Sequence, residues 1–236
     1  MNVRVVLVDN GCNLDRSVLR AVAEAATIQM HRDFGRPVPY GFGVTATVRV
    51  AKDLDDIRKD EWVLEYLPKL KLESGGPLGY HEIAPNGLPR MIVFPFLDDP
   101  HMRGLVETHE IIETLADPWT NKTIPDQFGR LVACEPADPV EPSWYPIAVR
   151  GGWVPVSNFV TPAYYLPQQY PNVPYDFLGQ LRYPGEILPG GFLSTFSPSS
   201  GGKWTQQTNG FRRPYRSVQH ARSRTNRRAR GNIQYT

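Results

Sequence analysis

The last acidic residue of this chain is Glu186, and no aspartate or glutamate follows it. Nine of the 26 lysines and arginines lie beyond it, so the other 17 face all 24 acidic side chains in residues 1–186, where the net charge is −7. Residues 197–202 are rich in serine, glycine and proline, and the polar sequence after them has too few apolar residues to bury a core. The sequence therefore predicts an acidic folded body over residues 1–196 and an extended basic C-terminal arm over residues 197–236.

The body opens with a β-α-β pattern over about residues 1–70. Residues 3–8 form a short, β-branched apolar run that is typical of a buried strand. Apolar residues then recur at helical spacing, with Asp15 placed to cap the helix and Gly35 to end it. Residues 44–50 alternate between apolar and polar side chains, as a half-buried strand does. Residues 62–67 are compatible with either a strand or a helix.

A second helix is predicted over residues 104–115, and Pro118 bounds it. Prolines and irregular loops dominate beyond it. Short strands are predicted over residues 78–83 and 91–96 around the Asn86-Gly87 turn, then at 131–134, at 148–149 with 153–156, and at 192–196. The expected fold class is α+β, with a small mixed sheet, one active-site-type helix, a proline-rich irregular C-terminal half and an extended basic tail.

The second helix carries the sequence His109-Glu110-Ile111-Ile112-Glu113. Residues four apart lie on one helix face, so His109 and Glu113 can both point at one cation. The pattern is the HExxH zinc-peptidase signature with glutamate in place of the second histidine. In that signature the glutamate after the first histidine is the general base that takes a proton from metal-bound water, so Glu110 is the candidate catalytic residue.

A third metal ligand has to come from outside the helix, and carboxylates cluster about twenty residues downstream. We expect Glu135 to be this ligand and Asp138 to hold it in place. Asp117, one further turn along the helix, either supports the site in the same way or ends the helix before Pro118. Ligands of this kind suit Zn²⁺, and their hard oxygens also admit Mn²⁺ or Ca²⁺.

The same residues have simpler interpretations. A solvated helix face shows His-Glu-x-x-Glu by accident, in which case the metal is weakly bound, structural or absent. Single histidines near turns, such as His81 and His101, are more often hydrogen-bonded or exposed to solvent than bound to a metal.

Several motifs resemble those of a family of phage, prophage and bacterial proteins that look like minimal zincins. The matching segments are Gly79-Tyr80-His81-Glu82, Gly87-Leu88-Pro89, residues 108–118, 131–138, 156–164, 175–179 and 189–191, within residues 75–195. The resemblance implies a zincin-like arrangement, with an edge strand before an active-site helix. It also implies a metal held by His109, Glu113 and a downstream carboxylate.

The basic arm is typical of a segment that binds an anionic partner, either nucleic acid or an acidic groove on a neighbouring subunit. Its candidate contact residues are Arg212, Arg213, Arg216, Arg222, Arg224, Arg227, Arg228 and Arg230. No membrane partner is expected, because no apolar stretch approaches the length needed to span a bilayer.

The basic arm and the resemblance to the zincin-like family together favour a bacteriophage virion-associated structural protein. It would be built on a zincin-like metal-binding scaffold and anchored among capsid or tail proteins by the arm. The alternative is an active metallopeptidase with Glu110 as general base, and a third option is a free nucleic-acid-binding protein. The expected location is the virion, or otherwise the cytoplasm of the bacterial host.

Overall fold

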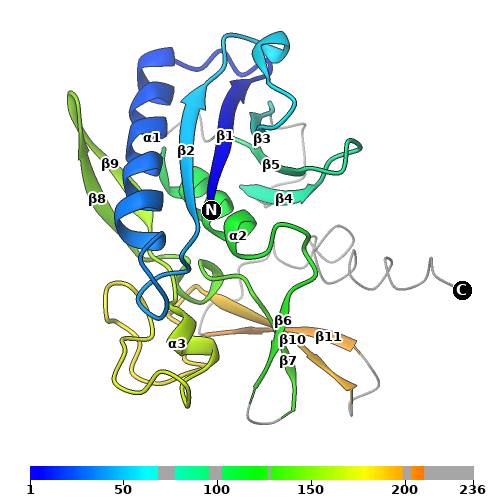
Figure 1. Cartoon of the computed structure of the whole chain (residues 1–236), viewed down its shortest axis with the longest axis vertical. Helices are drawn as coiled ribbons and strands as arrows, with labels where there is room; N and C mark the ends of the chain where they lie inside the picture. Colours follow the sequence, from blue (N-terminus) through cyan, green and yellow to red (C-terminus); the bar gives the residue numbers. More distant parts are fainter. Residues whose placement is uncertain (69–77, 96–102, 127–128, 199–202, 210–236) are drawn as a thin grey trace, which may run out of the picture.

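The computed structural model describes residues 1–68, 78–95, 103–126, 129–198 and 203–209. Within them the chain forms three β-sheets and few helices, so the predicted α+β class is confirmed (Figure 1). None of the described helices is both long and apolar enough to cross a membrane.

The largest sheet has five strands in the order β2-β1-β3-β5-β4. Its strands are β1 (Asn2–Asp9), β2 (Thr45–Val50), β3 (Trp62–Tyr66), β4 (Gly79–Ile83) and β5 (Pro89–Val93). Neighbouring strands are parallel except at one edge, where β4 pairs antiparallel with β5. The pairing of β1 with β2 confirms the predicted β-α-β opening, and the ambiguous segment at 62–67 is a strand.

Helix α1 (Arg16–Gln29) joins β1 to β2. Its predicted cap is present, because the Asp15 carboxylate accepts a hydrogen bond from the Ser17 backbone N–H at 2.7 Å, which satisfies one of the free donors of the first turn. The helix continues through a short π-helical turn (Met30–Phe34). Val5 and Leu7 of β1 belong to the main core with the helices, whereas Val6 and Val8 pack in a smaller cluster on the other face of the sheet.

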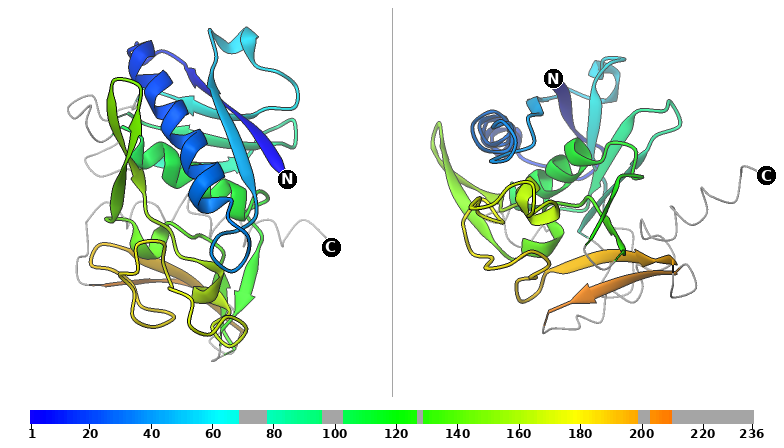
Figure 2. Two further views of the ribbon diagram at one scale, coloured as in Figure 1. Left: turned by 60° about the vertical axis from the view of Figure 1, so that its left-hand side comes forward. Right: turned by 60° about the horizontal axis from the view of Figure 1, so that its bottom comes forward.

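Helix α2 (Leu105–Ala116) lies beside α1, against β4 and β5 (Figure 2). It begins at Gly104, whose φ is +103°. A Cβ there would lie 2.3 Å from Val154 Cγ1, so only glycine fits this position. The Ser157 backbone N–H donates to Thr108 Oγ1 at 2.9 Å. Helix α2 is therefore held by β9 as well as by β4 and β5.

The C-terminal half holds a hairpin and a second sheet. The hairpin of β8 (Trp144–Val149) and β9 (Gly152–Ser157) stands beside α1 (Figure 1). The second sheet is antiparallel, in the order β11-β10-β7-β6. Its strands are β6 (Thr123–Pro125), β7 (Leu131–Ala133), β10 (Phe192–Ser197) and β11 (Lys203–Thr208), and short helices lie at Leu54–Asp56, Asp138–Val140 and α3 (Pro162–Tyr165).

The predicted boundary between body and arm at residue 197 falls inside the β10–β11 hairpin. The first part of the predicted arm therefore pairs with the body along the whole of β11, a correction to the predicted division. The arginines from Arg212 to Arg230 lie outside the described residues, as does His101.

Candidate metal centre

Helix α2 and the turn Asp138–Val140 bring three predicted residues together. His109 Nε2 lies 3.3 Å from Glu113 Oε1 and 3.3 Å from Asp138 Oδ1. One ligand atom from each residue lies within 4.8 Å of the other two. The expectation that His109 and Glu113 share one helix face is met by this geometry, and a carboxylate from the downstream cluster completes the group.

The carboxylate in this group is Asp138, whereas the sequence favoured Glu135. Glu135 is also buried, and its side chain hydrogen-bonds Asp138. In the structure Asp138, and not Glu135, is therefore the carboxylate that lies beside His109 and Glu113. This difference follows from the turn, because Pro139 and the helical turn that begins at Asp138 place this side chain toward α2.

A second group forms on the other side of Glu113. His81, in the middle of edge strand β4, places Nδ1 at 3.5 Å from Glu110 Oε2 and 3.8 Å from Glu113 Oε2. These three side chains also offer ligand atoms within 4.8 Å of one another, and all three are buried. Glu113 belongs to both groups, with one oxygen facing each histidine.

The spacing within both groups matches that of atoms around a cation. Two ligand atoms that each lie about 2.1 Å from one tetrahedral Zn²⁺ are about 3.4 Å apart. The four distances above run from 3.3 to 3.8 Å. They exceed the roughly 2.7–2.9 Å of a charge-assisted hydrogen bond, so the pairs leave room for an ion. A first-row divalent cation fits this donor set of imidazole nitrogens and carboxylate oxygens.

Gly79 makes the approach of β4 to Glu110 possible. A Cβ at Gly79 would lie 2.8 Å from Glu110 Oε1 and 3.0 Å from Glu110 Cγ. Because this position has no side chain, Glu110 can lie against the strand and reach His81, two residues further along it. The sequence Gly79-Tyr80-His81 thus provides both the space and the facing imidazole.

Burial makes the negative charge of the centre costly. Burial raises the pKa of Glu110 and of Asp138 to about 8 and that of Glu113 to about 7, with neighbouring carboxylates adding to each shift. Burial also lowers the pKa of His109, but Glu113 and Asp138 outweigh this and hold it well above its usual value. Among the described residues, no lysine or arginine forms an ion pair with Glu110 or Asp138. A cation would supply the missing positive charge.

These pKa shifts predict how the cation-free protein responds to pH. A carboxyl group whose pKa is higher in the folded than in the unfolded state stabilises the fold at low pH, and this contribution is lost as pH rises through the folded-state pKa. The raised pKa of His109 acts in the same direction. We expect the melting temperature of chelator-treated protein to fall by at least about 4 °C between pH 5.5 and 8, measured by scanning calorimetry.

Carboxylates with lowered pKa values do not obscure this trend. Glu61, whose pKa is lowered by its hydrogen bonds with Arg49, is already ionised at pH 5.5 in both states. The Glu110→Gln variant is the control. It lacks one carboxyl group with a raised pKa, so its melting temperature should fall less between pH 5.5 and 8. A melting temperature that stays constant or increases between pH 5.5 and 8 would contradict the raised pKa values of these buried carboxyl groups.

The loop that carries Asp138 is held from three directions. Backbone N–H groups of Cys134, Val160 and Leu188 donate to the carbonyls of Lys122, Pro136 and Pro139, at 3.1, 2.8 and 2.9 Å. Asp117 ends α2 and accepts hydrogen bonds from the N–H groups of Asn121 and Lys122. It belongs to neither ligand group and instead fixes the turn whose Lys122 carbonyl anchors Cys134, next to Glu135. The irregular C-terminal half therefore positions the acidic turn.

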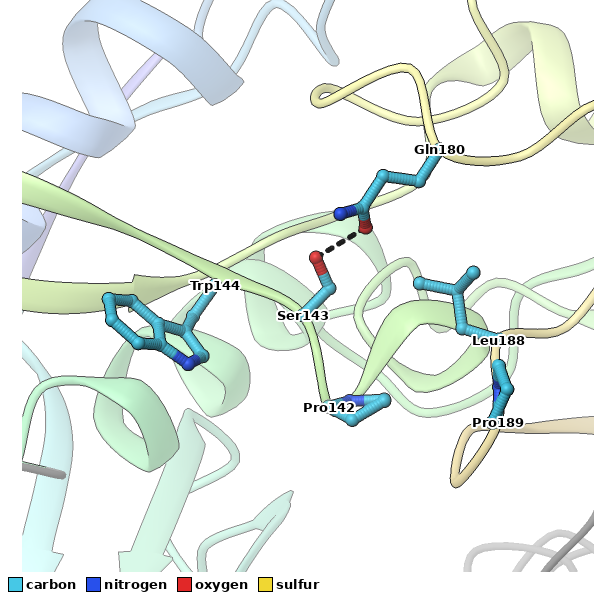
Figure 3. A pocket seen from close by; sticks show the side chains of 6 residues that line it. All are labelled: Pro142, Ser143, Trp144, Gln180, Leu188 and Pro189. Atoms are coloured by element: carbon cyan, nitrogen blue, oxygen red, sulfur yellow. Dashed lines mark hydrogen bonds between the residues drawn. The ribbon is translucent and has the colours of Figure 1, made fainter.

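A surface pocket lies next to this loop, but it is separate from the candidate metal centre. It is lined by Pro142, Ser143, Trp144, Gln180, Leu188 and Pro189. Ser143 Oγ donates a hydrogen bond to Gln180 Oε1 at 2.6 Å across it (Figure 3). None of the histidines or carboxylates of either ligand group lines this pocket. Solvent reaches the centre at His109, whose side chain is 15% exposed, against 6% or less for the other ligand-group side chains.

The sequence predicted a hydrogen-bonded or exposed His81, whereas in the structure His81 is buried beside Glu110 and Glu113. The signal available in the sequence was the resemblance of Gly79-Tyr80-His81-Glu82 to the zincin-like family, which pointed to the edge strand but not to a ligand on it. No family model, curated protein or solved structure matches the chain.

Proposed function

We propose that this chain is a metal-dependent hydrolase on a zincin-like scaffold, with a first-row divalent cation, Zn²⁺ foremost, held by His109, Glu113 and Asp138. The observation that carries the proposal is that these three residues, two on a helix and one on a separate turn, place one ligand atom each within 4.8 Å of the other two. One histidine and two carboxylates are a donor set of the catalytic type, which leaves a position for water or substrate. The zincin-like assignment is supported by the antiparallel edge strand β4 beside α2.

The bound cation would polarise a substrate carbonyl and make its water more acidic. Glu110 follows the ligand His109 directly, as the general base does in the HExxH signature. The positive charge of a bound cation would lower the pKa of Glu110 and keep it ionised. Its Oε2 accepts no hydrogen bond from any described residue, so it would be available to take a proton. A peptide amide is the substrate class that the signature favours, which makes the protein a candidate metallopeptidase.

The test uses the full-length chain freed of metal with a chelator. After incubation with one equivalent of ZnCl₂ and desalting, elemental analysis should find one zinc ion per chain. Cleavage of fluorescently labelled casein should appear with zinc and disappear with 1,10-phenanthroline. The histidine that serves as control is His31, an exposed residue near Thr47 Oγ1, and His31→Ala should change neither result. Protein that retains no zinc, manganese or calcium would overturn the proposal.

The virion-associated role remains a prediction from the sequence. It depends on the arginines beyond Arg212, which could bind capsid proteins, tail proteins or nucleic acid. In that setting the metal centre would belong to a particle component, and hydrolysis would be directed at a partner in the particle or in the host cytoplasm.

A further inference from the structure

The carboxylate of Glu113 lies between two histidines that come from different elements. Its Oε1 is 3.3 Å from His109 Nε2 on α2, and its Oε2 is 3.8 Å from His81 Nδ1 on β4. Each histidine also faces one further carboxylate, Asp138 for His109 and Glu110 for His81. The two halves of the centre therefore have the same composition. Each has one imidazole and one carboxylate that belongs to that half alone, and both halves share Glu113.

We propose that the centre binds two divalent cations, one at His109 and Asp138 and one at His81 and Glu110, with Glu113 bridging them. The first of these is the cation of the proposed function, on which this inference rests. The second site adds His81 as a ligand and takes up Glu110 Oε2, the oxygen that faces His81. Glu110 is therefore the general base when only the first site is filled and a ligand when both sites are filled. A carboxylate that offers one oxygen to each of two cations suits the spacing of about 3.5–4 Å found in two-metal sites.

No contact with another described residue gives His81 a different role. It is fully buried, and neither ring nitrogen has a hydrogen-bond partner among the described residues. Burying an imidazole without hydrogen bonds is costly, so such groups usually have a partner. Its Nδ1 points at the two carboxylates, where a cation would satisfy it. The absence of a Cβ at Gly79 allows Glu110 to lie against the same strand.

Charge balance also favours more than one cation once these carboxyl groups are ionised. Glu110, Glu113, Glu135 and Asp138 are all buried, and their ionised forms carry four negative charges. The imidazoles must be neutral to bind metal. Two divalent cations balance the four carboxylates in full, whereas one leaves half of the charge uncompensated in a buried site. Mixed imidazole and carboxylate ligands suit Zn²⁺ and Mn²⁺ at both positions.

The experiment titrates the metal-free, full-length chain with MnCl₂ and measures bound manganese by elemental analysis after desalting. We expect two equivalents in the wild type. Electron paramagnetic resonance should show the two ions coupled, with loss of the six-line signal of isolated Mn²⁺ at full loading. His81→Ala should bind one equivalent with an isolated signal, and His31→Ala should bind two.

The outcomes separate this inference from the proposed function. One equivalent in the wild type, unchanged in His81→Ala, overturns the second cation but leaves the first site standing. No bound metal overturns both. If His81→Ala proves unfolded by circular dichroism, the wild-type spectrum decides: coupled ions support the bridge, and isolated ions reject it.

Discussion

Replacing Glu110 by glutamine should reduce kcat/KM for peptide cleavage by between about 10² and 10⁴-fold. The neutral amide can neither take a proton nor act as an anionic ligand for a second cation. The cation at His109 should remain, because His109, Glu113 and Asp138 are unchanged. The measurement is casein cleavage at one equivalent of ZnCl₂, combined with elemental analysis of the same samples.

Two comparisons make this result specific to Glu110. Glu24→Gln changes an exposed glutamate on α1 and should leave cleavage unchanged. The metal-free Glu110→Gln protein should also be more stable than the wild type at pH 8, since a buried carboxylate has been replaced by a neutral group of the same shape. Loss of activity in a stabilised protein excludes unfolding as the cause. Full activity in Glu110→Gln would remove this residue from the chemistry.

Elements defined by local signals were predicted well. The apolar period from Val18 to Met30 and the cap at Asp15 specify α1, since both act within a few residues of sequence. Strand β11 was missed for the opposite reason, because its run Thr205-Gln206-Gln207 is polar. Its stability comes from pairing with β10, a partner that composition alone does not reveal.

The candidate site divides in the same way. His109 and Glu113 could be paired from the sequence because helical geometry fixes their relation. His81 could not, since its position depends on the antiparallel register that sets it opposite Met91 on β5, beneath α2. The choice between Glu135 and Asp138 depended on a three-residue helical turn, which is shorter than any periodic signal.

Replacing Glu113 should have the largest effect on metal binding, because it is the one residue present in both ligand groups. We expect Glu113→Gln to lower the affinity for Zn²⁺ by more than about 100-fold, beyond the loss typical of residues that only support a ligand. Neither half of the centre keeps two carboxylates in this variant. Isothermal titration calorimetry of the metal-free protein measures the change.

The variant Glu113→Asp separates the effect of the negative charge from that of the side-chain length. It keeps the negative charge, but its carboxylate is one methylene closer to α2, so it cannot contact both histidines as Glu113 does at 3.3 and 3.8 Å. We expect it to bind at most one cation. If charge alone held the metals, Glu113→Asp would retain the wild-type stoichiometry, and the bridging position of Glu113 would have to be abandoned.

Asp138→Asn alters only the His109 half of the centre, so it should lose one cation and keep the other. The three variants together assign each ligand to its half of the centre.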